Sequence, residues 1–131
     1  MAGIPESRYD LFESESFCHF ATLLPNGFPH VTPVWVDHDG GDVLINTARG
    51  RRKERNVRQD PRAGFSVLDP DDPYRFCSGW GEVVEVTSES AVEHIDELAR
   101  RYMDVEEYPY KDQDEGERLI VRLRPEHVVT E

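Results

Sequence analysis

The chain has 131 residues and a formal net charge of −12, and it holds no apolar run of the roughly 18 to 20 residues that a membrane-spanning helix needs. This length predicts a single domain, residues 1–131, with one core and no membrane partner. The acidic opening from Met1 to Glu15 lacks the basic and apolar regions of a signal peptide, so we expect a cytoplasmic protein.

The polar composition is biased in two ways. Thirteen of the fifteen basic residues are arginine, and 27 acidic residues outnumber them, as in proteins of salt-loving microorganisms, whose surface carboxylates stay hydrated and screened. We therefore expect a halophilic protein whose acids are mostly solvated. Cys18 and Cys77 lie in apolar runs without C-x-x-C spacing, which favours buried free thiols over a disulfide.

The first third of the chain is rich in β-forming residues. Two such runs, 17–24 and 28–37, are separated by the turn sequence Pro25-Asn26-Gly27 and predict a hairpin. A second turn at Asp39-Gly40-Gly41 leads into residues 42–47. We expect these three strands to form an antiparallel meander.

Three helical segments are expected. A short one lies within residues 4–15, and a second runs over 51–59 until Asp60-Pro61 stops it, because the residue before proline avoids the helical region. The third runs over 91–103, where apolar residues recur at helical intervals behind capping-box spacing at Ser90.

The remaining chain adds long strands and an acidic loop at 104–116. Gly79 and Gly81 flank Trp80 inside one of these strands and indicate a bend or bulge. The further strands are expected at 62–69, 75–86 and 118–124. Long antiparallel strands with glycine kinks and few helices predict a mainly β (α+β) barrel.

A short basic segment stands out within this acidic chain. Residues 49–58 carry six of the fifteen basic side chains and a net charge of +5, inside a remainder of −17. Cations at the start of a helix favour a bound phosphate. The alternative is a solvated basic helix whose side chains pair with acidic residues on the surface. Nucleic acid is disfavoured, because the surrounding charge repels a polyanion while a small phosphate responds mainly to nearby arginines.

Three stretches of the chain resemble a known family in their order and spacing. They are 25–35 (PNGFPHVTPVW), 43–48 (VLINTA) and 51–57 (RRKERNV). Together they are similar to the flavin and deazaflavin oxidoreductases related to pyridoxamine 5′-phosphate oxidase. This resemblance implies a split β-barrel, an antiparallel Greek-key-like barrel with a few flanking helices.

The resemblance also implies a homodimer with two cofactors at the subunit interface, either FMN or the deazaflavin coenzyme F420. The cofactor would exchange a hydride with a small organic substrate, and no side chain is assigned a catalytic role. The chain ends at Glu131 without the long segment that helps bind pyridoxamine in the true oxidase, so vitamin B6 oxidation is not implied. The alternative function is a carrier or sensor that binds the same cofactor without turnover.

The candidate cofactor-binding residues, from the resemblance and from the residues' own chemistry, fall into a ring-side group and a phosphate-side group. They are Thr32, Pro33, Val34, Trp35 and Trp80 beside the ring, and Asn46, Thr47, Arg51, Arg52, Lys53, Arg55 and Asn56 toward the phosphate.

Each of these assignments has an alternative. Strand alternation lets only one of two sets in 31–36 line a pocket, and we favour the set that holds Thr32 and Val34. Asn46 and Thr47 could instead cap the following helix, and Trp80 could pack in the core or at a dimer interface. His19, His30 and His38 show no spacing typical of metal ligands, so no metal is expected.

Overall fold

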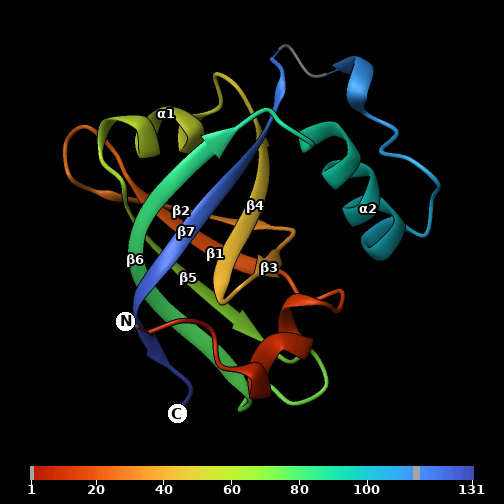
Figure 1. Ribbon diagram of the computed structural model, residues 1–131. Coiled ribbons are helices and arrows are strands. Elements are labelled where there is room, and N and C mark those ends of the chain that lie inside the picture. The colour runs from red at the N-terminus through yellow and green to blue at the C-terminus, as the bar shows by residue number, and fades with distance from the viewer. Residues whose placement is uncertain (1, 114–115) are drawn as a thin grey trace.

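The structure, a computed structural model, describes residues 2–113 and 116–131. Within these ranges the chain forms one antiparallel sheet with strand order β2-β1-β5-β6-β7-β4-β3, flanked by helices (Figure 1). The elements are η1 (Glu6–Phe12), β1 (Cys18–Leu23), β2 (Pro29–Val34), β3 (Asp37–Asp39), β4 (Asp42–Ala48), α1 (Arg52–Gln59), β5 (Arg62–Leu68), β6 (Phe76–Thr87), α2 (Ala91–Met103), η2 (Lys111–Gln113) and β7 (Arg118–Val129).

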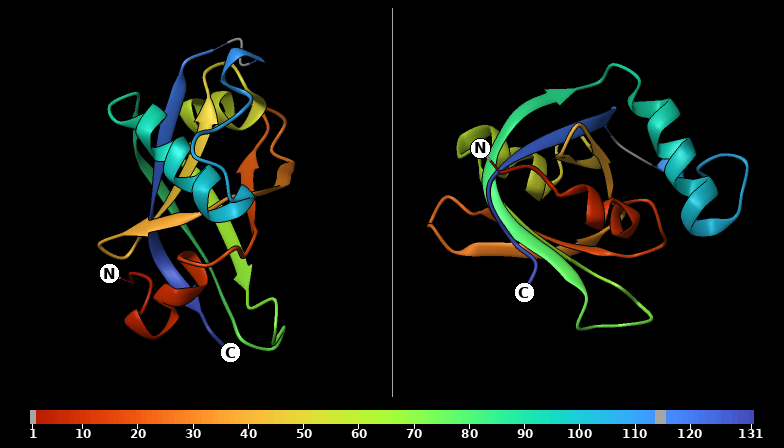
Figure 2. Two further views of the ribbon diagram at one scale, coloured as in Figure 1. Left: turned by 90° about the vertical axis from the view of Figure 1, so that its right-hand side faces the viewer. Right: turned by 60° about the horizontal axis from the view of Figure 1, so that its bottom comes forward.

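The sheet curls on itself into a barrel, as the two views of Figure 2 show, and the mainly β prediction is confirmed. Its two edge strands, β2 and β3, follow each other in the chain and are joined by Trp35 and Val36. Among the described residues, no ladder pairs these two edges.

The predicted hairpin and the turn at Asp39-Gly40-Gly41 are confirmed, but the predicted three-strand meander is wrong. β1 pairs with β2 around a turn in which Gly27 has a φ of +87°, but β4 pairs with β3 and β7 and not with β2. The chain leaves the ladder at Val36, because its N–H donates to the Tyr102 hydroxyl and its C=O accepts from Arg101. Both partners lie on α2, so a distant helix ends this strand.

Glycine allows β6 and β7 to approach closely at the predicted bulge. The register shifts between Trp80 and Gly81, and a Cβ built on Gly81 would lie 2.0 Å from the carbonyl oxygen of Arg124. β7 crosses this point and continues to Val129, beyond the end at residue 124 that the alternation predicted.

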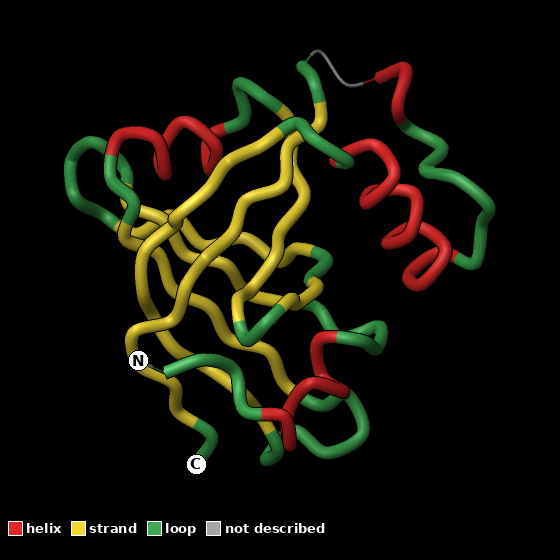
Figure 3. Tube along the Cα trace, in the orientation of Figure 1, coloured by secondary structure: helices red, strands yellow, loops and turns green. Residues whose placement is uncertain are grey.

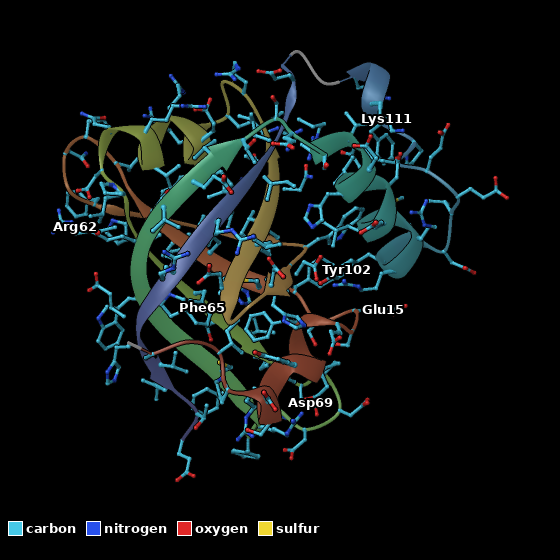
Figure 4. The ribbon with its side chains drawn as sticks, in the orientation of Figure 1. Glu15, Arg62, Phe65, Asp69, Tyr102 and Lys111 are labelled. Carbon is cyan, nitrogen blue, oxygen red and sulfur yellow. The ribbon has the colours of Figure 1, made fainter. Side chains whose placement is uncertain are left out.

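The barrel interior is filled by aromatic and branched side chains, and Figure 4 shows Phe65 within it. η1 contributes Phe12, which is fully buried and packs edge-on against Phe65 with ring centroids 6.1 Å apart. The predicted buried thiols are confirmed: Cys18 and Cys77 are both free and buried, and burial raises the pKa of Cys18 to about 12.

α1 and α2 lie on either side of β4 and the start of β7 (Figures 1 and 3). α2 has the predicted bounds, whereas α1 begins one residue later than predicted, after Arg51. The predicted capping box is wrong, because Ser90 adopts a left-handed conformation (φ 61°) in which its side chain caps nothing. In the described part of the chain, every helix is too short or too polar to cross a membrane.

Candidate functional site

A pocket of about 450 Å³ lies between α1 and α2, next to the Trp35–Val36 link. Strand ends supply one side of it, α2 and the segment after it the other. Its lining residues are Phe17, Pro33, Val34, Trp35, Asn46, Thr47, Arg51, Lys53, Ile95, Tyr102, Met103, Tyr108, Tyr110 and Arg118.

One part of the pocket is cationic. Lys53, Arg51 and Arg118 all line it, and burial together with the charges of Arg51 and Arg118 lowers the pKa of Lys53 below 10.5. Among the described residues, no carboxylate forms a salt bridge with Lys53. A half-buried ammonium beside two guanidinium groups is an arrangement that an anion stabilises.

Arg51 reaches this place because it precedes the helix. It is the N-cap of α1 with extended backbone angles (φ −67°, ψ 155°). Arg51 and Lys53 therefore line the same pocket, although only Lys53 lies within the helix.

Arg118 is a buried cation that the sequence reasoning missed. It opens β7 opposite Ala48, is only 7% exposed, and donates from Nε to the Asn46 Oδ1 at 2.9 Å. Its guanidinium carbon lies 5.3 Å from the centre of the Tyr108 ring. The only local signal was an arginine in an alternating strand, which reads equally well as a solvated side chain.

Thr47 is a polar residue of the same lining. It is fully buried, and its Oγ1 has no hydrogen-bond partner among the described residues. Buried hydroxyls are nearly always hydrogen-bonded in native proteins. The Thr47 Oγ1 has almost no accessible surface, so Thr47 belongs to the lining as a residue and its hydroxyl lies behind the pocket surface.

The rest of the pocket is aromatic. The Trp35 ring stacks on Tyr102 with centroids 5.1 Å apart and an angle of 7° between the planes, and Tyr108 meets Trp35 edge-on. Figure 4 shows Tyr102 between α2 and the barrel. Such a wall suits a planar heterocyclic ligand.

Asp96 on α2 fixes the segment that carries the other two tyrosines. It accepts hydrogen bonds from the Tyr108 N–H at 2.9 Å and from the Lys111 ammonium. Burial raises its pKa, but these bonds outweigh burial and hold the pKa of Asp96 below its usual value. Tyr108 and Tyr110 lie in the segment predicted as an acidic loop and were not among the predicted site residues, yet both line the pocket.

The structure brings seven of the predicted cofactor-binding residues together and leaves five outside. Those in the lining are Pro33, Val34, Trp35, Asn46, Thr47, Arg51 and Lys53. The prediction that strand alternation admits only one set is wrong, because Pro33 and Val34 are neighbours within β2 and both line the pocket. Of the two favoured residues, Val34 lines the pocket and Thr32 does not.

The other residues outside the lining have different neighbours. Asn56 is fully buried, accepts from Arg52 and donates to Thr22, so it ties α1 to β1. Arg55 is exposed on the helix. Trp80 is 55% exposed, stacks on His127 and lines a second pocket of about 310 Å³ on the outer side of β1, β5 and β6.

The model of the pyridoxamine 5′-phosphate oxidase family matches residues 4–130. The chain belongs to this family. Its members bind FMN or the deazaflavin coenzyme F420. The cationic and aromatic parts of the pocket match the phosphate and the ring system of such a cofactor, so the residues present fit the group.

Solved structures of this family's fold resemble the chain along nearly its whole length. A protein named F420 reductase is 30% identical, with a TM-score of 0.81 over 96% of this chain and 98% of the other. A conserved hypothetical protein of Mycobacterium tuberculosis is 26% identical, with a TM-score of 0.74 over 95% and 82%.

General Stress Protein 26 of Bacillus anthracis, at 12% identity and a TM-score of 0.67 over 91% and 86%, shares the fold. No curated protein matches the chain in sequence.

Proposed function

We propose that this chain is an oxidoreductase that binds a phosphorylated deazaflavin or flavin in the pocket between α1 and α2. The observation that carries the proposal is that one pocket combines an aromatic wall with a half-buried Lys53, which has no carboxylate partner among the described residues. When bound, the cofactor supplies hydride transfer to or from a small organic substrate.

The phosphate would lie against Lys53, Arg51 and Arg118. The lowered pKa of Lys53 records an electrostatic cost in the ligand-free protein, and a phosphate removes that cost. These side chains hold and orient the ligand.

The ring would lie toward Trp35, Pro33 and Val34. Among the described residues, the lining holds no carboxylate and no imidazole, so its titratable side chains are cations and tyrosines. The protein's part is therefore to bind, orient and exclude water. Proton exchange with a substrate would fall to tyrosine or to solvent.

F420 is the first cofactor to test. The 30% identity to a protein named F420 reductase, over nearly the full length of both chains, supports it. FMN has a phosphate and a similar tricyclic ring, so it remains the comparison ligand.

The lack of a carboxylate or imidazole in the described lining also favours a second candidate, a cofactor carrier or sensor without turnover. Purified protein incubated with reduced cofactor and a panel of electron acceptors separates the two. Oxidation faster than in a protein-free control supports an oxidoreductase, and tight binding without it supports a carrier.

The binding site is tested by fluorescence titration of F420 and FMN. Lys53→Ala should raise the dissociation constant by about 10- to 100-fold, since hydrogen bonds to charged groups contribute about 1.5–3 kcal/mol. Arg55→Ala, an exposed cation on the same helix outside the lining, is the matched control and should change it less than about twofold. Equal effects of the two substitutions would overturn the assignment.

We also propose that the chain forms a homodimer through the outer side of β2 and β6. Val31 and Trp80 are each 55% exposed and Phe28 is 68% exposed. Val31 shares a strand face with Pro29, which lines the second pocket together with Trp80. Large exposed apolar groups gathered on one face are typical of an interface.

Light scattering during size-exclusion chromatography tests the dimer. The wild-type chain should elute at twice its mass, and Val31→Asp should shift it toward the monomer because a charge would be buried at the interface. Val92→Asp, at an exposed apolar position on α2, serves as the control. A monomeric wild-type protein would refute the dimer.

A further inference from the structure

Buried His94 on α2 is connected to the cationic part of the pocket through Asn46. The Asn46 Nδ2 lies 3.1 Å from the His94 Nδ1, and the Asn46 Oδ1 accepts from the Arg118 Nε at 2.9 Å. We propose that His94 is a positioning residue, which holds Asn46 in the orientation that directs Arg118 to the ligand's phosphate. This inference rests on the proposed function.

The donors and acceptors in this network allow one arrangement. The Ala91 C=O can only accept and lies 2.8 Å from the Asn46 Nδ2, while the Arg118 Nε can only donate. The amide nitrogen therefore faces Ala91 and His94, and the amide oxygen faces Arg118. Its second N–H is left for the His94 Nδ1, which must then act as an acceptor.

The other ring nitrogen of His94 extends this hydrogen-bond network to Asp37. With Nδ1 accepting, the proton lies on Nε2, which donates to the Asp37 Oδ2 at 3.1 Å. Arg101 contacts the second oxygen of Asp37 at 3.2 Å. Burial raises the pKa of Asp37, but the bonds from His94 and the His38 N–H and the charge of Arg101 outweigh it, so this carboxylate is ionised and a strong acceptor.

Burial makes the orientation of Asn46 matter. His94 and Arg118 are each 7% exposed, so water has little access to replace a lost partner. Rotation of the Asn46 amide would turn its NH₂ group toward Arg118, where two donors would face each other. Arg118 would then move from its place beside Lys53 in the pocket.

A purely structural role for His94 would use its other nitrogen. The bond from Nε2 to Asp37 ties α2 to β3 and needs no connection to the pocket. The two roles therefore depend on different atoms of one ring, and two substitutions separate them. Asn places an oxygen where Nδ1 stands, and Gln places an NH₂ group where Nε2 stands.

The experiment compares His94→Asn with His94→Gln in fluorescence titrations of F420 and FMN. Positioning through Asn46 predicts that His94→Asn stays within about threefold of wild type, while His94→Gln raises the dissociation constant about tenfold, the worth of one hydrogen bond. In an Asn46→Ala background, His94→Gln should add no further loss. The reverse order, equal effects, or additive losses would overturn the inference.

A second measurement needs neither a substitution nor a ligand. In ¹⁵N spectra of the histidine-labelled wild-type chain, the His94 proton should lie on Nε2, and a proton on Nδ1 would refute the network. If wild type binds neither F420 nor FMN, the proposed function fails, and this tautomer alone decides whether the His94–Asn46 arrangement exists.

Discussion

Burial and two neighbouring cations disfavour the charged form of Lys53. Burial and the charges of Arg51 and Arg118 lower its pKa, which means that its charged form is less stable here than in water. A partly buried charge that lowers the stability of the protein contributes to ligand binding rather than to folding. Its counter-ion would be the ligand.

This cost predicts proton uptake when an anion binds. Because the pKa of Lys53 is lowered in the free protein, part of the population loses its charge at alkaline pH, below 10.5. A bound phosphate favours the charged form and raises the pKa again, so a proton is taken up, and affinity falls as pH rises through the lowered pKa.

Calorimetric titration of FMN at alkaline pH, in two buffers with different ionisation enthalpies, measures this uptake. Lys53→Met, which keeps the length of the side chain, should abolish it. Uptake that is the same in wild type and Lys53→Met would show that another group titrates.

The long strand β6 depends on glycine where β7 crosses it. A Cβ at Gly81 would lie 2.0 Å from the Arg124 carbonyl oxygen, closer than any tolerated contact, whereas at Gly64 the nearest atom lies at 3.4 Å. Gly81→Ala should therefore lower the free energy of unfolding by at least about 2 kcal/mol, and Gly64→Ala by less than about 1 kcal/mol. Urea unfolding measures both. Similar losses would mean that the backbone relaxes at the bulge.

Local signals predicted the elements well and their partners poorly. The turn at Pro25-Asn26-Gly27 and the apolar spacing of α2 act within a few residues, and both were read correctly. The pairing of β4 with β7 joins residues 70 to 80 positions apart, and no local pattern encodes it.

The same limit explains which of the pocket's lining residues could be predicted from the sequence. Lys53 and Arg51 were recognised because six cations gather in ten residues. Arg118 and Tyr108 reach the pocket only through the strand order and the contacts of Asp96 with the segment after α2. Resemblance supplied Pro33 and Trp35, which alternation places on one face, and both line the pocket.

The surface charge of the molecule predicts a dependence on salt. A net charge of −12 on 131 residues produces repulsion that the folded chain must overcome. Raising KCl from low to molar concentration should increase the melting temperature by several degrees, because the screening length falls from about 30 Å at 0.01 M to about 3 Å at 1 M. Calorimetry in KCl, without phosphate, checks this. An unchanged melting temperature would argue against a halophilic protein.

The short link between the two barrel edges is held by the same helix that walls the pocket. Tyr102 and Arg101 engage the N–H and C=O of Val36, while the Tyr102 ring also faces the pocket beside Trp35. Substitutions at Tyr102 chosen to widen substrate range would thus also weaken the contacts that hold the link between β2 and β3. Protein engineers should begin at Met103 or Tyr110, which share the lining.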